Sequence, residues 1–181
     1  AGFTSIQIVT IRLTVAALSF ALILFLKNKK GFLITPKDIP LFLGLGLGSI
    51  LFFSTCYFTA ISMMTLSVAA ILLYTSPIWV MLLSILLFHE KMTGTKLFAL
   101  AVSFLGCILV SGIGTGKTSV TITGILIGLG SGLGYGLYSI LGAIALRRYS
   151  TYTVTAYTFI TAATGSFFVC NLPDLCHKIT A

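Results

Sequence analysis

Acidic side chains are almost missing from this chain. Asp and Glu together number three in 181 residues, and charged residues of both signs make up only 8%. Because a soluble domain carries roughly 25% charged residues, the composition excludes a protein surrounded mainly by water. Cysteine is also scarce, and Cys56, Cys107, Cys170 and Cys176 have neither metal-ligand nor CxxC spacing. The sequence therefore predicts no metal and no cofactor, and it leaves a Cys170–Cys176 disulfide open without requiring one.

Long apolar stretches are what the chain has instead. Hydrophobic residues make up 57% of it, and a helix that crosses a bilayer needs about 20 consecutive apolar residues. Six stretches meet this requirement, near residues 6–26, 41–60, 66–88, 97–114, 121–146 and 153–172. We therefore expect an all-α, polytopic transmembrane helix bundle whose main partner is the lipid bilayer.

Positive charges lie in alternate gaps between these stretches. One side would hold eight of them: Lys27, Lys29, Lys30, Lys37, Lys91, Lys96, Arg147 and Arg148. The other side would hold Lys117 and Lys178. The positive-inside rule makes the first side cytoplasmic and places Ala1 outside. No nucleic acid is expected as a partner, because the charges form no basic groove interleaved with stacking aromatics. We expect the chain to be truncated at both ends, with an odd number of helices missing before Ala1.

A weak internal repeat has an offset of 146 residues. It sets residues 3–8 beside residues 149–154 and brings Ala16–Ala17 onto Ala162–Ala163 without a gap. Counted from the missing first helix, each copy then holds five helices. An odd number of helices inverts the second copy in the membrane, which is the architecture of many secondary transporters.

Five short segments follow one another along the chain: Arg12-Leu-Thr-Val-Ala-Ala, Tyr57-Phe-Thr-Ala-Ile, Leu73-Tyr-Thr-Ser-Pro-Ile-Trp, Leu87-Phe-His-Glu-Lys and Gly106. In this order and spacing they resemble the EamA domain of the drug/metabolite transporter superfamily. The resemblance implies ten helices in two inverted repeats, cytoplasmic termini and movement of solutes by alternating access. Residues 1–114 would then be the first repeat without its first helix, and residues 115–181 the start of the second. The resemblance also implies a bacterial inner membrane and a transporter rather than an enzyme.

Arg12 is the one charged residue well inside a predicted span. A cation there costs about 2.5–3.5 kcal/mol on insertion scales, so it should face the bundle or a water-filled cavity. Two interpretations stay open: an anchor for a substrate carboxylate or phosphate, and a cation that snorkels or bonds to a neighbouring helix. Together with Arg12, the mid-span tyrosines are the predicted substrate-binding residues: Tyr57, Tyr74, Tyr135 and Tyr138.

Pro77 lies near the middle of the third span, where its ring removes one helical hydrogen bond and crowds the carbonyl of Leu73. We expect a kink there, with Tyr74 toward a central cavity and Trp79 pointing elsewhere. The fifth span has glycine at every fourth position, at Gly124, Gly128, Gly132 and Gly136. This spacing lets helix backbones approach closely. It predicts tight packing or, as an alternative, a smooth face that slides during a transport cycle.

Glu90, beside Lys91 at the cytoplasmic end of the third span, matches a position where the family commonly has Glu. We expect it to be a structural ion pair or gate element. The sequence as a whole predicts a secondary transporter that exports small metabolites or drug-like solutes. Two alternatives stay open: a non-transporting assembly or channel subunit, and a membrane-embedded enzyme on lipid-linked substrates. The enzyme is disfavoured because the sequence has no carboxylate pair, His–Asp pair or metal-ligand set near an interface. A homo-oligomer is compatible with the glycine spacing.

Overall fold

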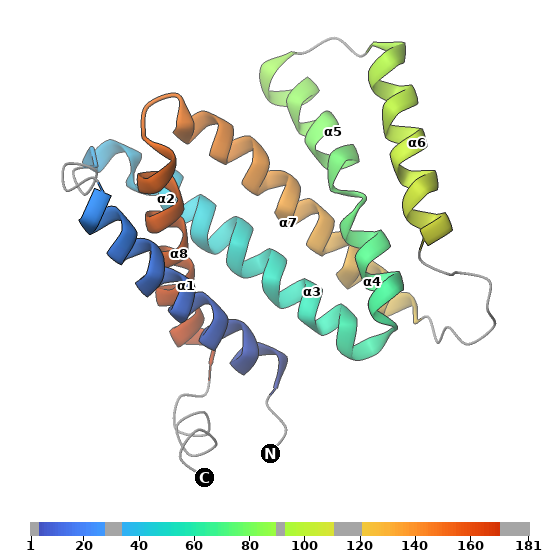
Figure 1. Cartoon of the computed structure of the whole chain (residues 1–181). Coiled ribbons are helices and arrows are strands. Elements are labelled where there is room, and N and C mark those ends of the chain that lie inside the picture. The colour runs from blue at the N-terminus through green and yellow to red at the C-terminus, as the bar shows by residue number, and fades with distance from the viewer. Residues whose placement is uncertain (1–3, 28–33, 90–92, 111–120, 171–181) are drawn as a thin grey trace.

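The described part of the chain is helical throughout. A computed structural model describes residues 4–27, 34–89, 93–110 and 121–170. In chain order its elements are α1 (Ser5–Lys27), the 3-10 turn η2 (Pro36–Asp38), α2 (Ile39–Leu43), the π-helix η3 (Gly44–Leu51), α3 (Phe52–Met63), α4 (Leu66–Leu73), α5 (Ser76–Phe88), α6 (Gly94–Val110), α7 (Ile122–Leu146) and α8 (Thr151–Val169). Figure 1 shows α1, α3, α5, α7 and α8 packed beside one another, with α6 at the edge of the bundle.

Four helical segments are long and apolar enough to cross a membrane. They are Ser5–Lys27, Pro36–Met63, Leu66–Phe88 and Ile122–Leu146. The two other predicted spans are α6, which contains a shorter apolar helical stretch, and α8, which is 19 residues long and rich in threonine. The all-helical architecture and its apolar segments confirm a polytopic helical membrane protein.

Successive long segments run in opposite directions. In Figure 1 the Lys27 end of α1, the Phe88 end of α5 and the Leu146 end of α7 lie toward the upper edge, and the turn between α3 and α4 lies toward the lower edge. The ends of successive segments therefore lie on alternate sides of the bundle, as the alternating positive charges predict. The basic residues Lys27 and Arg147 consequently share one side of the bundle.

The third predicted span is two helices rather than one. α4 ends at Leu73, α5 begins at Ser76, and Pro77 occupies the first turn of α5, where its missing N–H costs no helical bond. Thr75 compensates for the interruption, because its Oγ1 donates a hydrogen bond to the carbonyl oxygen of Leu72 at 2.6 Å. The proline thus begins a new helix after a break at residues 74–75.

Asp38 stands at the start of the second span. Its place before Pro40 predicts an N-cap, and it is the N-cap residue of α2 by position, although its side chain makes no capping hydrogen bond. The carboxylate instead pairs with the guanidinium of Arg148 at 3.0 Å and accepts a hydrogen bond from the Tyr149 hydroxyl at 2.6 Å. A charged partner and a phenol outcompete the backbone N–H groups of the first turn.

The π-helix η3 lies where the second span meets α8. Gly46 faces Thr161 so closely that any side chain there would overlap it. The Thr161 hydroxyl donates to the carbonyl oxygen of Phe42 at 3.1 Å, and the Ser49 hydroxyl donates to the Gly44 carbonyl oxygen at 3.1 Å. Because π-helical turns widen the backbone ladder, these hydroxyl bonds supply partners for carbonyls near the segment.

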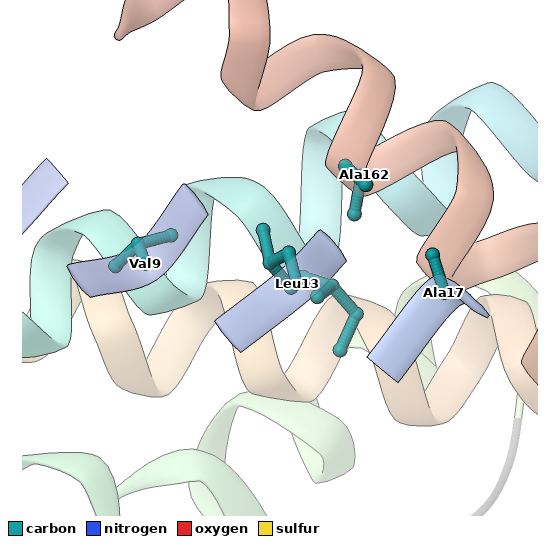
Figure 2. Packing of buried hydrophobic residues seen from close by; sticks show 6 residues of the cluster. Val9, Leu13, Ala17 and Ala162 are labelled. Atoms are coloured by element: carbon teal, nitrogen blue, oxygen red, sulfur yellow. The ribbon is translucent and has the colours of Figure 1, made fainter. Parts of the chain in front are cut away.

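A small-residue contact joins α1 to α8. Val9, Leu13 and Ala17 of α1 form one buried cluster with Ala162 and Ala163 of α8, and Figure 2 shows Leu13 and Ala17 beside Ala162. The two helices run antiparallel (Figure 1). The repeat offset aligns Ala17 with Ala163, so two residues that the repeat makes equivalent meet in the same core.

Helix α7 lies between α3 and the α4–α5 pair. A methyl group on Gly132 would lie 2.6 Å from Thr75 Oγ1 and 3.0 Å from the Leu72 carbonyl oxygen, and one on Gly136 would lie 2.9 Å from Trp79 Cβ. The tight packing predicted from the four-residue glycine spacing is therefore found. Glycine is required at these positions because the neighbouring backbone occupies the space of a side chain.

Candidate functional site

The guanidinium of Arg12 lies between α1 and α3. Its Nη2 donates a hydrogen bond to Ser54 Oγ at 3.2 Å, and its Cζ lies 5.3 Å from the centre of the Phe58 ring. Ser54 and Phe58 are four residues apart, so they share one face of α3. The Ser54 side chain is fully buried, whereas Arg12 keeps exposed surface. A guanidinium has five N–H donors, so the cation is held on one edge and retains donors for a further acceptor.

A continuous series of aromatic rings leads away from Arg12. We call it the aromatic row, and in spatial order it consists of Phe58, Tyr57, Phe53, Tyr135 and Tyr138. The successive ring centres are 6.0, 5.9, 5.6 and 6.3 Å apart. These separations fall in the range of favourable aromatic pairs. The row crosses from α3 to α7, and it therefore joins two helices that come from distant parts of the sequence.

Tyr74 lies at the break between α4 and α5, and its side chain is exposed. The structure joins four of the five predicted substrate-binding residues, Arg12, Tyr57, Tyr135 and Tyr138, through the aromatic row. This region combines a guanidinium, which binds carboxylate or phosphate, with three phenol hydroxyls and several apolar ring faces.

Three other residues named from the sequence lie elsewhere. Trp79 packs through its Cβ against Gly136 of α7, so it takes part in helix packing. Pro77 is exposed at the start of α5, two residues after Thr75 and the break. Glu90 lies outside the described residues.

Three members of the region were missed in the sequence. Ser54, Phe53 and Phe58 hold Arg12 and link the tyrosines to one another. The signal that points to Phe53 is its four-residue spacing from Tyr57, which places both rings on one face of a helix. For Ser54 and Phe58 the sequence offers no comparable signal, because their partner is on another helix.

The fold defines an integral, multi-pass helical membrane protein in which the partly exposed Arg12 guanidinium contacts α3. Residues 1–112 match the profile of the EamA-like transporter family. The chain belongs to this family, and the resemblance read from the sequence is confirmed.

Similar proteins from an archaeon and a bacterium carry transporter names. An uncharacterized transporter of Archaeoglobus fulgidus is 25% identical over 86% of this chain and 53% of its own length. The uncharacterized transporter YdfC of Bacillus subtilis is 27% identical over 87% of this chain and 50% of its own length. The chain therefore spans about half the length of these curated relatives. No solved structure matches it at a significant level.

Proposed function

We propose that the complete protein is a secondary transporter that exports small metabolites or drug-like solutes by alternating access. The solute binds beside Arg12 and the aromatic row, with Tyr74 at the α4–α5 break. The observation that carries this proposal is the convergence, from three separate helices, of the Arg12 guanidinium with the rings of Tyr57, Tyr135 and Tyr138. Intramembrane cations are costly and mark solute pathways by default.

The chemistry of Arg12 favours a solute with a carboxylate or phosphate. The guanidinium forms two parallel hydrogen bonds to such groups, and the ring faces beside it suit an apolar or aromatic remainder of the solute. Ser54 holds the guanidinium from the opposite side at 3.2 Å, which reduces the rotamer freedom that the arginine loses on binding.

Alternating access in this proposal depends on two inverted repeats that move relative to each other. In this proposal residues 1–114 belong to the first repeat and residues 115–181 begin the second. The antiparallel contact of α1 with α8, in which Ala17 and Ala163 share a core, supports a pseudo-two-fold axis between the repeats. The protein would lie in the bacterial inner membrane, with the basic ends of α1 and α7 on the cytoplasmic side.

The test is solute export from cells that carry the complete gene. Arg12→Ala, Arg12→Lys and the unaltered protein are compared at matched membrane abundance, with a panel of anionic, zwitterionic and cationic compounds. Because a hydrogen bond to a charged group contributes about 1.5–3 kcal/mol, we expect Arg12→Ala to raise KM for carboxylate-bearing solutes about 10- to 100-fold. Arg12→Lys keeps the charge without the planar fork and should give an intermediate loss.

Equal export of every compound by Arg12→Ala and the unaltered protein would contradict the role of Arg12. The concentration dependence of export separates a carrier from a channel subunit, because a carrier saturates. A non-saturating flux would favour the channel, and the absence of any flux would favour an assembly subunit, for which the tight glycine contacts of α7 are also suited.

A further inference from the structure

One carboxylate joins the start of the second span to the turn between α7 and α8. Asp38 Oδ1 pairs with Arg148 Nη1 at 3.0 Å, and its Oδ2 accepts a hydrogen bond from the Tyr149 hydroxyl at 2.6 Å. The same hydroxyl accepts a hydrogen bond from the backbone N–H of Thr35 at 3.1 Å. Asp38 is the only carboxylate in the part of the chain that the structure describes. We call Asp38, Arg148 and Tyr149 the polar latch.

The two sides of the latch differ in exposure, and this decides its strength. The Arg148 side chain is 69% exposed, whereas that of Asp38 is 12% exposed. An ion pair with one exposed partner is weak on its own. The hydrogen bond from Tyr149 is short, charged and partly buried, and bonds of this kind are about twice as strong as neutral ones. The latch is therefore stable enough to form and weak enough to open.

Two cation–aromatic contacts flank the latch on the same turn. The Arg147 guanidinium carbon lies 5.5 Å from the centre of the Phe88 ring at the end of α5, and Lys27 Nζ at the end of α1 lies 5.6 Å from the centre of the Tyr152 ring. The α7–α8 turn thus contacts the ends of three other segments. In Figure 1 this turn lies at the same edge as α2 and the Lys27 end of α1.

A buried apolar cluster, which we call the apolar layer, packs against Tyr149 of the latch. Phe42, Leu45, Ala145 and Val154 form a buried cluster, and the Tyr149 ring meets the Phe42 ring at 5.3 Å between centres. Tyr138, at one end of the aromatic row, packs against this cluster. The apolar layer thus contacts both Tyr138 of the candidate solute site and Tyr149 of the latch.

We propose that the polar latch is the cytoplasmic gate of this transporter. It holds the apolar layer shut in the conformation described, and it opens when the solute site becomes accessible from the cytoplasm. Opening separates Asp38 from Arg148 and Tyr149 and moves the Tyr149 ring off Phe42. This proposal rests on the proposed function, because a gate has meaning only in a protein that exposes one site to two sides. A few hydrogen bonds suffice to hold the gate closed, since the open and closed conformations of such a protein differ by only a few kcal/mol.

The gate is tested by the accessibility of a thiol placed beneath it. Ala145 is fully buried under the latch, and Ala145→Cys changes little volume. In the complete protein, with the native cysteines replaced by alanine, a membrane-impermeant maleimide is applied to the cytoplasmic face of inside-out vesicles. We expect slow labelling with the latch intact and labelling about tenfold faster with Asp38→Asn, which corresponds to about 1.4 kcal/mol. Tyr149→Phe should give a smaller increase.

Lys37→Gln is the matched control. It removes a charge next to Asp38, and Lys37 has no carboxylate partner among the described residues, so labelling should stay at the unaltered rate. Equal labelling rates in Asp38→Asn and Lys37→Gln would overturn the gate. So would fast labelling of Ala145→Cys with the latch intact. Retention of helix content and monodispersity in detergent confirms that each variant is folded.

A second experiment cross-links the two charged positions of the latch. Asp38→Cys and Arg148→Cys are combined and joined by a short, thiol-cleavable cross-linker, and solute export is measured before and after reduction. We expect export to stop when the link forms and to return when it is cleaved. Continued export with the link in place would overturn the gate while leaving the transporter intact. The labelling result needs no solute, so faster labelling in Asp38→Asn without any export by the unaltered protein would support the closure and contradict the proposed function alone.

Discussion

Arg12 of α1 donates a hydrogen bond to the fully buried hydroxyl of Ser54 on α3, at 3.2 Å. A buried hydroxyl fixes the guanidinium because a long side chain at a helix surface otherwise samples many rotamers. The bond joins the first and second spans at the position where we place the solute. Ser54 is consequently a positioning residue for Arg12.

Replacing Ser54 should therefore weaken solute binding. A typical hydrogen bond contributes about 0.5–1.5 kcal/mol net, so Ser54→Ala should raise KM for carboxylate-bearing solutes about two- to tenfold, with little change in the maximal export rate. Ser166→Ala is the control, because Ser166 is equally buried on α8 and bonds only to the Ala163 carbonyl of its own helix. Equal effects of the two variants on KM would contradict a specific role for Ser54.

The close contact of α7 with α4 predicts a large effect at Gly132. A methyl group there would lie 2.6 Å from Thr75 Oγ1 and 3.0 Å from the Leu72 carbonyl oxygen, and overpacking costs about 1–3 kcal/mol. Gly132→Ala should lower the free energy of unfolding by this amount. At Gly142 no neighbouring atom of the described residues lies within 4 Å of such a methyl group, so Gly142→Ala should stabilise the helix by up to about 1 kcal/mol. Unfolding by a denaturing detergent in mixed micelles measures both, and equal stability of the two variants would show that α7 does not pack this closely.

The break at residues 74–75 depends on the Thr75 hydroxyl. The Leu72 carbonyl oxygen accepts two hydrogen bonds, from the Thr75 hydroxyl at 2.6 Å and from the Thr75 N–H at 3.2 Å. Thr75→Val preserves the shape but removes the shorter bond, and it should lower the free energy of unfolding by about 0.5–1.5 kcal/mol. Thr75→Ser keeps the hydroxyl and should lose less than half of that. The same unfolding assay measures both variants. If Thr75→Val is as stable as Thr75→Ser, the hydroxyl bond does not stabilise the break.

The alternating direction of the helices predicts opposite labelling of two exposed positions. Ser62 is at the end of α3, and Thr151 is at the start of α8, on the opposite side of the bundle. In intact bacteria that carry the complete protein without its native cysteines, an impermeant maleimide should label Ser62→Cys and not Thr151→Cys. In inside-out vesicles the pattern should be reversed. Labelling of both positions from one side would contradict the topology.

Much of the fold could be predicted from hydrophobicity alone. The predicted spans at 6–26 and 121–146 agree with α1 and α7 to within a residue or so, because long apolar stretches have no other stable arrangement in a bilayer. The third span shows the limit of this signal. Pro77 predicts a break in the helix, but its location at residues 74–75 is not given by the sequence. The Thr75 hydroxyl bonds to the Leu72 carbonyl oxygen there, and Gly132 of α7 packs against both residues from another helix.

The candidate site was predictable only in part. The isolated charge of Arg12 and the mid-span position of the tyrosines single them out, since polar groups are costly in lipid. Phe53 and Phe58 could not be recognised as the links between them, because a phenylalanine is ordinary in any membrane helix. Phe53 is important because its ring lies between the rings of Tyr57 and Tyr135.

By itself, the sequence determined that lipid surrounds most of the chain, and it determined the direction of the apolar segments, the basic side and the spacing that lets α7 pack closely. These properties depend on each segment's own composition and period, so they need no knowledge of neighbouring helices. Only the tertiary structure decided that Asp38 contacts Arg148 and Tyr149 rather than capping its own helix, and that Arg12 contacts Ser54. Such partners are set by where helices cross, and a crossing depends on the packing of all the helices together.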